Sequence, residues 1–318
     1  MVVSIGVDVG GTNIVCGAVD ENGRVLRKLK RPTEAKLGQE SVLNRIADMV
    51  RVIRNAMASE HFVSCVGVGI PGLVDSKKGI SKFAGNLKWR NVSVAPELEK
   101  QIGLPVYIDN DVRLYIYGEA IAGAGRGYSH ILGITIGTGI AAAIVNDGKL
   151  LYGHKSMAGE IGHVRMAGVE ERCSCGLVGC LETVASASGM VRQAKKAIAE
   201  GRESLLMQWF PGGDIDKLTA ADLSKAMDEG DALATETIIR AGILNGQALA
   251  AAATVLSPEL IVVGGGGALA GDRLLGPLRD EFYRLILPDF REDLKIVTAE
   301  HNDDAGIIGS ALHAIHQS

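Results

Sequence analysis

The sequence predicts an α/β protein made of two related domains, because one pattern of strands occurs twice along the chain. The first copy has apolar runs at 2–9, 14–19 and 23–27, with a Gly-Thr loop after the first run and an Asn-Gly turn after the second. The second copy, over 130–151, repeats this order of strands, loop and turn. Each copy predicts a β-meander. The doubling favours two α/β domains over one doubly wound sheet, with a ligand site in the cleft between them.

The remaining stretches show either helical or strand-like spacing of apolar residues. Before the second copy, the spacing predicts a helix over 41–58, strands over 65–72 and 106–108, and a helix over 112–122. After the second copy, it predicts helices within 185–227 and over 232–256, strands over 260–263 and 295–297, and a final helix over 305–316. Asn110 and Asp111 stand where they could cap the helix over 112–122.

Composition and charge indicate a globular protein with small-molecule ligands. The 318 residues are 47% apolar, which is enough to fill sizeable cores. The formal net charge is -4 and the basic residues are scattered, so we expect no nucleic-acid partner and no membrane partner. No export signal is visible near the first residue, and the most apolar windows look too short to span a bilayer. The five cysteines form no disulfide framework, which favours a cytoplasmic location.

One short segment concentrates metal-binding side chains: His163, Cys173, Cys175 and Cys180. The spacing His-x9-Cys-x-Cys-x4-Cys supplies one imidazole and three thiolates, which are the donors that zinc prefers in a tetrahedral site. Four protein donors close the coordination shell, so we expect a structural Zn²⁺ and assign the chemistry to neighbouring carboxylates. The alternative is a redox pair of cysteines or a set of small buried residues.

Three glycine-rich loops could hold a nucleoside triphosphate. Their candidate ligands are Asp8, Gly10, Gly11, Thr12 and Asn13 in the first loop, Gly137, Thr138 and Gly139 in the second, and Gly265 and Gly266 in the third. Backbone N–H groups in such loops can hold phosphate oxygens, and Asp8 could orient a Mg²⁺ and its waters. None of the loops fits the Walker or dinucleotide pattern. The alternative for each loop is a tight turn without a ligand.

Asp111 is a candidate catalytic base. A phosphoryl-transfer enzyme needs a carboxylate that accepts the proton of the attacking hydroxyl, together with Mg²⁺ and fixed donors for the phosphate charge. The helix start after Asp111 would favour its charged form and make it a modest base. The alternative role is that of a helix N-cap, which is the ordinary function of an Asn-Asp pair at such a junction.

Taken together, these motifs resemble the ROK family of sugar kinases and repressors, within the actin-like and hexokinase-like ATPase superfold. The resemblance covers nearly the whole chain and rests on the segments 8–12, 71–75, 86–89, 110–111, 137–139, 159–163, 173–182, 264–267 and 304–309. It implies two actin-like (ribonuclease H-like) α/β domains with an interdomain cleft. We assign the smaller domain, with the first phosphate loop and Asp111, to 1–115 plus 300–318. The larger domain, with the second phosphate loop, the zinc loop and the adenosine loop, is assigned to 116–299.

The resemblance also implies roles for single residues. Asp111 would take the proton from the 6-hydroxyl of a hexose. The other sugar hydroxyls would be bound by Asn86, Asn110, Glu160, His163 and Glu182. Gly72 would approach the sugar, although it also fits a plain turn after Pro71. His163 would bind zinc through one ring nitrogen and meet the sugar through the other. Arg113 departs from the family, in which a small polar residue, commonly Asn, stands at this position.

The resulting hypothesis is an ATP- and Mg²⁺-dependent hexose kinase that acts on glucose and binds a structural Zn²⁺. An N-acetylhexosamine kinase is the first alternative, since it needs the same base and phosphate loops but a roomier pocket at C2. A sugar-responsive repressor would need a DNA-binding extension before the first strand, and none is visible. An actin-like filament or chaperone ATPase would not need sugar-type carboxylates beside a zinc loop. The family resemblance favours a homodimer.

Overall fold

The computed structural model describes residues 2–318, apart from the side chains at 212 and 213, and divides the chain into two compact units. Unit 1 consists of Met1–Ser129, Ala143–Ala158 and Ala299–Ser318, and unit 2 consists of His130–Ala142 and Gly159–Thr298. Unit 1 therefore also takes in 116–129 and 143–158, which the sequence-based boundaries place in the second domain. The physical reason at 116–129 is helix α3 (Asp111–Ala122), which packs along α10 (Ala305–Gln317) of the same unit.

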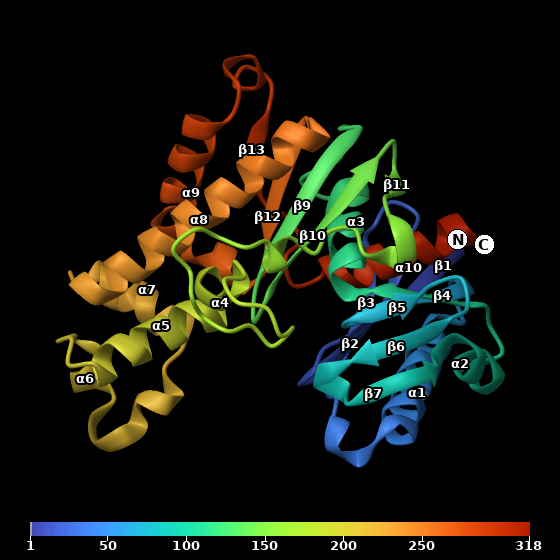
Figure 1. The fold of residues 1–318 in the computed structure, drawn as a ribbon. Coiled ribbons are helices and arrows are strands. Elements are labelled where there is room, and N and C mark those ends of the chain that lie inside the picture. The colour runs from blue at the N-terminus through green and yellow to red at the C-terminus, as the bar shows by residue number, and fades with distance from the viewer. Residues whose placement is uncertain (1) are drawn as a thin grey trace. The chain divides into compact units, whose positions relative to one another are not determined.

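Unit 1 is built on a five-stranded sheet with the order β3-β2-β1-β4-β8. Figure 1 labels four of these strands, β1 to β4. Its strands are β1 (Val2–Val9), β2 (Asn13–Asp20), β3 (Val25–Pro32), β4 (Phe62–Ile70) and β8 (Val106–Asn110). The strands β1, β2 and β3 form the predicted antiparallel meander, and β4 and β8 add in parallel register. A smaller antiparallel sheet, absent from the predicted elements, contains β5 (Leu73–Asp75), β6 (Ile80–Ala84) and β7 (Trp89–Ser93).

Helices cover both faces of the larger sheet in unit 1. The strand period of two places Val3, Ile5 and Val7 in the core that includes α1 (Gln39–Met57). The alternate residue Gly6 lies against α10, so closely that a Cβ atom would overlap the carbonyl oxygen of Ile307. Helix α2 (Val94–Ile102) packs on α1 and β8, whereas α3 and α10 pack together and contact β4 and β8. Because Gly6 has no side chain, α10 can pack directly against the backbone of the sheet.

A second five-stranded sheet has the order β11-β10-β9-β12-β13 and contains the predicted second meander. Its strands are β9 (His130–Ile136), β10 (Ile140–Asn146), β11 (Lys149–Leu150), β12 (Leu260–Gly264) and β13 (Lys295–Thr298). Strand β12 is parallel to both β9 and β13. The helices of unit 2 are α4 (Glu182–Ala185), α5 (Ala187–Ala199), α6 (Leu206–Trp209), α7 (Ala220–Asp228), α8 (Ala232–Leu256) and α9 (Asp272–Leu285). Short 3-10 helices lie at Ala35–Leu37 (η1), Gly85–Leu87 (η2), His154–Ser156 (η3), Ile161–His163 (η4), Pro211–Lys217 (η5), Gly266–Ala270 (η6) and Pro288–Phe290 (η7).

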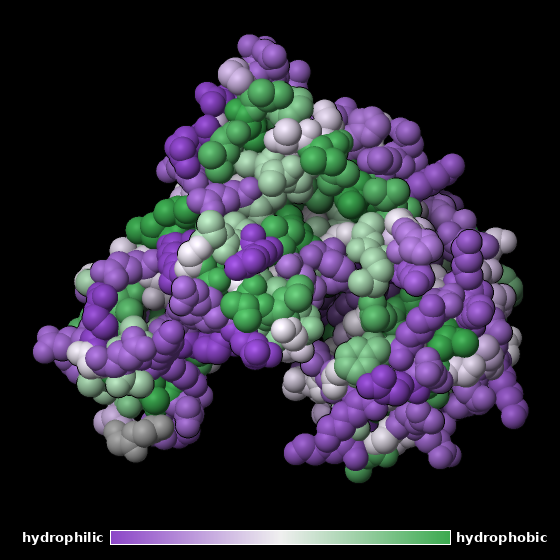
Figure 2. All heavy atoms as spheres, in the orientation of Figure 1, coloured by the Kyte–Doolittle hydropathy of each residue, from purple (hydrophilic) through white to green (hydrophobic). Residues whose placement is uncertain are grey.

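Helix α8 is the most apolar helix of unit 2 and matches the helix predicted over 232–256. Its 25 residues are apolar enough to cross a membrane by length and composition alone, so the expectation that the most apolar windows are too short is wrong for this helix. However, 56% of the relevant window is buried, and α8 packs against α9, α7 and α5, as a core helix does. Figure 2 shows hydrophobic side chains gathered over α8 and α9 on the face that it draws.

Candidate functional site

In unit 1 the junction between β8 and α3 holds the predicted base. Asn110 caps α3, because its side-chain oxygen accepts a hydrogen bond of 3.1 Å from the Arg113 N–H. The carboxylate of Asp111 accepts bonds of 2.9 Å at Oδ1 from Asn110 Nδ2 and from the Val112 N–H. Asn110 Nδ2 also donates to the carbonyl oxygen of Gly72 at 3.1 Å. The helix cap is therefore Asn110, and the structure places Gly72, Asn110 and Asp111 together.

Two partly buried carboxyl groups, those of Asp8 and Asp111, interact at this junction. Burial raises the pKa of Asp111 to about 6. The hydrogen bonds from Val112 and Asn110 and the charge of Arg113 act in the opposite direction and lower this pKa, but by less. Burial, and then the charge of Asp111, raises the pKa of Asp8 to about 7. The Asp8 side chain lies against the first turn of α10, since a Cβ atom on Gly306 would come 2.7 Å from its Oδ2. Asp8 and Asp111 thus form a like-charged pair that a cation would stabilise.

The first glycine loop follows β1 and is exposed at Gly11. The Gly10 N–H donates to the Asn13 carbonyl at 2.9 Å, and the Thr33 hydroxyl donates to the Gly10 carbonyl at 2.6 Å. These bonds hold the loop in one conformation. A Cβ atom on Gly11 would lie 3.2 Å from the Cβ atom of Asn86, so the predicted sugar ligand Asn86 is a neighbour of the loop.

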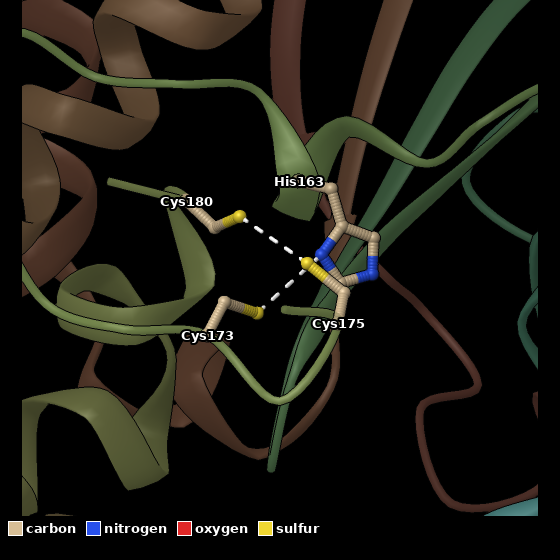
Figure 3. Close-up of side chains that lie close together, drawn as sticks. All are labelled: His163, Cys173, Cys175 and Cys180. Atoms are coloured by element: carbon tan, nitrogen blue, oxygen red, sulfur yellow. Dashed lines mark hydrogen bonds between the residues drawn. The ribbon is translucent and has the colours of Figure 1, made fainter. Parts of the chain in front are cut away.

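In unit 2 the four predicted metal ligands come together (Figure 3). The ligand atoms of His163, Cys173, Cys175 and Cys180 all lie within 4.8 Å of one another. His163 Nδ1 is 3.7 Å from Cys173 Sγ, and Cys175 Sγ is 3.7 Å from Cys180 Sγ. A tetrahedral zinc with Zn–S of about 2.3 Å and Zn–N of about 2.0–2.1 Å would place its ligand atoms about 3.5–3.8 Å apart. The donor set and its spacing therefore fit a zinc ion.

The two predicted sugar carboxylates of unit 2 lie beside this cluster. His163 Nε2 is 3.8 Å from Glu160 Oε2, and His163 Nδ1 is 3.8 Å from Glu182 Oε1. Cys173 Sγ lies 3.1 Å from the same Glu182 oxygen. The imidazole thus has Nδ1 on the cysteine side and Nε2 toward Glu160. A Cβ atom on Gly139 would lie 2.8 Å from Glu182 Oε2, so Glu182 stands between the cluster and the second glycine loop.

The second glycine loop opens on a cavity of about 500 Å³ whose lining the sequence did not predict. The Ser188 hydroxyl donates to the Thr138 carbonyl at 2.8 Å, and this bond ties the loop to the start of α5. One turn and two turns further along α5, Arg192 and Lys195 line the same cavity as Thr138. A positive helix start and two cations beside a glycine loop suit a polyphosphate. The only sequence signal for these residues is their spacing on a helix face.

The third glycine loop follows β12 and belongs to η6. Gly265 has a φ of +80°, and a Cβ atom there would lie 2.8 Å from the Ile136 carbonyl oxygen, so only glycine fits this close approach to β9. The 3-10 helix η6 contacts α7, whose first residue Ala220 lines the cavity of about 500 Å³. The structure therefore brings the second and third loops into one region of unit 2.

Comparison with known proteins gives the family. The sequence model described as "ROK family" matches residues 4–317. The chain belongs to the ROK family. The glucokinase of Thermotoga maritima is 36% identical, over 96% of this chain and 95% of that protein. A crystal structure of a ROK family glucokinase from Streptomyces griseus, in complex with glucose and AMPPNP, is 33% identical with a TM-score of 0.84 and covers 99% of each chain. The xylose repressor of Caldicellulosiruptor bescii is 28% identical, over 96% of this chain and 76% of that protein. The α/β fold expected from the sequence is thus that of the ROK kinases.

This ROK chain carries Arg113 in a buried position beside the junction between β8 and α3. The Arg113 side chain is 6% exposed, and its Nη1 lies 3.1 Å from Oδ1 of Asp109, which is fully buried. Its Nη2 donates to the Ser156 carbonyl, and its guanidinium lies 5.5 Å from the centre of the Tyr152 ring. Arg113 therefore links the start of α3 to the segment 152–156 of unit 1.

Proposed function

We propose that this protein is an ATP-dependent hexose kinase that phosphorylates the 6-hydroxyl of glucose. The observation that carries the proposal is the full-length similarity to ROK glucokinases, including the Streptomyces griseus enzyme whose structure contains glucose and AMPPNP. The site geometry supports it. Unit 1 supplies a buried carboxylate beside a glycine loop, and unit 2 supplies two more glycine loops beside a basic cavity.

Asp111 is the proposed base. Within residues 2–318 its side-chain and backbone donors, Asn110 Nδ2 and the Val112 N–H, both bind Oδ1. Oδ2 is then the oxygen that meets the sugar hydroxyl and takes its proton as the oxygen attacks the terminal phosphorus of ATP. The bond between that phosphorus and ADP breaks in the same step, and ADP leaves. A pKa of about 6 leaves Asp111 mostly ionised at neutral pH, while making it a stronger base than an exposed aspartate.

The sugar ligands of the proposal come from both units. Asn86, Asn110 and Gly72 in unit 1 would bind hydroxyls next to the base. In unit 2, Glu160 and Glu182 would accept hydrogen bonds from hydroxyls, and His163 Nε2 would donate one. The 3.8 Å approach of His163 Nε2 to Glu160 supports this orientation of the ring, because both groups then present polar atoms on the same side.

Asp8 and the glycine loops are the proposed nucleotide ligands. The loops at Gly10–Asn13 and Gly137–Gly139 would bind phosphate oxygens through their N–H groups, and the loop at Gly265 and Gly266 would lie against adenosine. Arg192 and Lys195 would add positive charge beside Thr138. Asp8 fits a Mg²⁺ ion or its waters, because burial and the charge of Asp111 raise its pKa and a bound cation would offset both effects. When bound, Mg²⁺ would neutralise phosphate charge during transfer.

The cluster of His163, Cys173, Cys175 and Cys180 is the proposed zinc site. Its four donors fill a tetrahedral shell, so the ion would serve to hold the loop rather than to activate water. By fixing Nδ1 of His163, it would orient the ring toward the sugar and keep Glu182 next to Gly139. A cytoplasmic location and a homodimer remain predictions from the sequence and the family resemblance.

The test is a coupled assay of ADP release with ATP and Mg²⁺ against glucose, N-acetylglucosamine, N-acetylmannosamine, fructose, mannose and allose. We expect glucose to give the highest kcat/KM. A preference for an N-acetylated sugar would show that the substrate is an N-acetylhexosamine rather than glucose. The proposed mechanism would stay the same. If no sugar releases ADP although the protein is folded and binds glucose in calorimetry, the kinase proposal is wrong and a sugar sensor takes its place.

A further inference from the structure

Unit 1 contains a cavity of about 460 Å³ that the proposed reaction does not use. It lies among the β5–β6 turn, the edge strand β8, the segment 152–156 and the end of α10. Its volume falls within the range of about 300–1,000 Å³ that is usual for small-molecule sites. None of the residues that line it belongs to the proposed sugar, phosphate or zinc ligands. We call it the lysine cavity, after Lys77, Lys82 and Lys155 on its wall.

The charge of the lysine cavity is positive. Lys82 pairs with Asp75, the one acidic residue of the lining, at 3.1 Å. Within residues 2–318 neither Lys77 nor Lys155 forms an ion pair, and both are exposed. Three ammonium groups around one concave surface, with one carboxylate to balance them, favour a ligand with two or more negative charges.

The wall also holds polar groups that the protein leaves unsatisfied. Ser76 Oγ and His313 Nδ1 are buried and have no hydrogen-bond partner among the described residues. His313 is 5% exposed, and its other ring nitrogen lies 3.3 Å from the Tyr152 hydroxyl. Buried polar atoms without a protein partner are uncommon, and a water, an ion or a polar ligand in the cavity would satisfy these two.

The backbone of one wall is in an unusual conformation. Lys155 and Ser156 have φ values of 55° and 58°, in the left-handed region that non-glycine residues rarely adopt. Arg113 holds this conformation, since its Nη2 donates to the Ser156 carbonyl. Two successive left-handed residues bend the backbone at the point where the Lys155 side chain joins the cavity lining.

A continuous set of contacts joins this wall to the proposed base. Arg113 contacts Ser156 on one side and Asp109 on the other. Asp109 Oδ1 accepts a bond of 2.6 Å from the Asn110 N–H, and Asn110 Nδ2 binds Asp111. A shift of Ser156 would therefore change the position of Arg113 and, through Asp109, the junction that fixes the carboxylate.

We propose that the lysine cavity is an effector site for a small metabolite that carries two or more negative charges on phosphate or carboxylate groups, and that its occupancy changes the action of Asp111. The ligand's anionic groups would bind Lys77, Lys82 and Lys155. The effect on Asp111 would pass through Ser156, Arg113 and Asp109. This second part rests on the proposed kinase function, whereas binding at the cavity does not.

The first experiment measures binding by calorimetry at fixed ionic strength, with citrate, glycerol 3-phosphate and 3-phosphoglycerate as probes and glycerol as the uncharged control. AMPPNP and Mg²⁺ are present at saturation, so that the glycine loops are occupied. We expect at least one anionic probe to bind and glycerol not to bind. The double variant Lys77→Ala/Lys155→Ala should weaken the probe about tenfold or more, since two charge contacts are lost. Lys100→Ala, which removes an exposed lysine of α2 that does not line the cavity, is the matched control.

The probe that binds identifies the source of the charge: citrate alone indicates carboxylates, and glycerol 3-phosphate alone indicates phosphate. Lack of binding by all three probes would refute the site. Equal binding to wild type and to the double variant, or an equal loss of binding in Lys100→Ala, would also refute it.

The second experiment tests the coupling, by measuring kcat and the sugar KM with and without the bound probe. We expect a change of at least twofold in one of them, and we expect Arg113→Lys to abolish the change while probe binding persists. Lysine keeps a charge beside Asp109 but cannot also reach the Ser156 carbonyl as the guanidinium fork does. An unchanged kcat and KM with probe bound to the active enzyme would refute the effector role. An enzyme without kinase activity would refute the proposed function and leave the binding result intact.

Discussion

Replacing Asp111 by Asn tests the proposed base most directly, because this change removes the charge and keeps the shape. The amide oxygen of Asn can accept the two 2.9 Å hydrogen bonds that Asn110 Nδ2 and the Val112 N–H now give to Oδ1. The amide nitrogen then occupies the place of Oδ2 and cannot accept a proton. General-base catalysis contributes about 10²–10⁴ to a rate. We therefore expect kcat to fall by about this factor, with a small change in the sugar KM.

The same substitution should stabilise the ligand-free protein at neutral pH. Burial raises the pKa of Asp111 to about 6, and burial with the charge of Asp111 raises the pKa of Asp8 to about 7. Both carboxyl groups ionise less readily in the folded chain than in the unfolded chain, whose ordinary pKa is 3.8. Their contribution to the free energy of unfolding is thus present below about pH 4 and is lost as the pH rises through about 6 to 7. Asn at 111 removes one of these carboxyls and the repulsion on the other.

The assay combines turnover with thermal unfolding, both without and with Mg²⁺. Asp111→Asn should show low kcat together with a higher unfolding midpoint than wild type near pH 7, and the midpoints should converge near pH 4. Asp48→Asn is the matched control, because the Asp48 side chain is 59% exposed on α1 and is not one of the proposed ligands. Turnover of Asp111→Asn close to that of wild type would remove Asp111 from the mechanism. A lower midpoint at neutral pH would refute the electrostatic argument for the carboxyl pair.

Further predictions concern the metal, the pH dependence and two packing positions. Cys175→Ser should lose most of its zinc and raise the sugar KM through the loop; elemental analysis that finds one equivalent of zinc would contradict the ligand set. Without divalent cations, wild-type stability should fall between about pH 4 and pH 7 and recover with Mg²⁺, as measured by denaturant unfolding, since the cation offsets the charges of Asp8 and Asp111. Glu119→Gln should lower the free energy of unfolding by about 2–3 kcal/mol. The buried Glu119 carboxylate accepts four backbone N–H bonds, three of them from 300–302, and an amide can satisfy only part of them. Gly309→Ala should cost about 3 kcal/mol, because its Cβ atom would overlap a backbone carbonyl of α3; an unchanged unfolding midpoint would show that α3 and α10 separate freely.

The elements with strong periodicity could be predicted from the sequence, and those with a weak or interrupted pattern could not. Both meanders and the helices α1, α3, α8 and α10 agree closely with the expected ranges. The strands β5, β6 and β7 are three to five residues long and bury residues without a regular period of two, so they lack the alternation that marks a half-buried strand. Helix α9 contains Gly276 and Pro277, which read as a break, yet packing of Leu278 and Phe282 in the core keeps it helical.

The candidate site shows the same division between local spacing and tertiary packing. The cluster of three cysteines and His163 lies within one short segment, so its spacing was enough to predict that the donors converge. Arg192 and Lys195 have no motif of their own. They reach the second glycine loop because Ser188 ties the start of α5 to Thr138, and only the folded chain shows this contact. The position of Arg113 was visible as a departure from the family, but its partners Asp109 and Ser156 were not.

Helix α10 explains why the two carboxyls of unit 1 have shifted pKa values in the first place. The first turn of α10 packs at Gly306 against Asp8, which leaves water little access to that carboxyl. Further along, Gly309 lies against α3, the helix that begins at Asp111. One helix therefore fixes both carboxyls, one by direct contact and one through α3, and small residues at the contacts let the backbones approach. A side chain at Gly309 would move α3 relative to β1, so it should change the distance between Asp8 and Asp111 as well as the stability. If Asp111 is the base, as proposed, the close packing of α10 serves the reaction as well as the core.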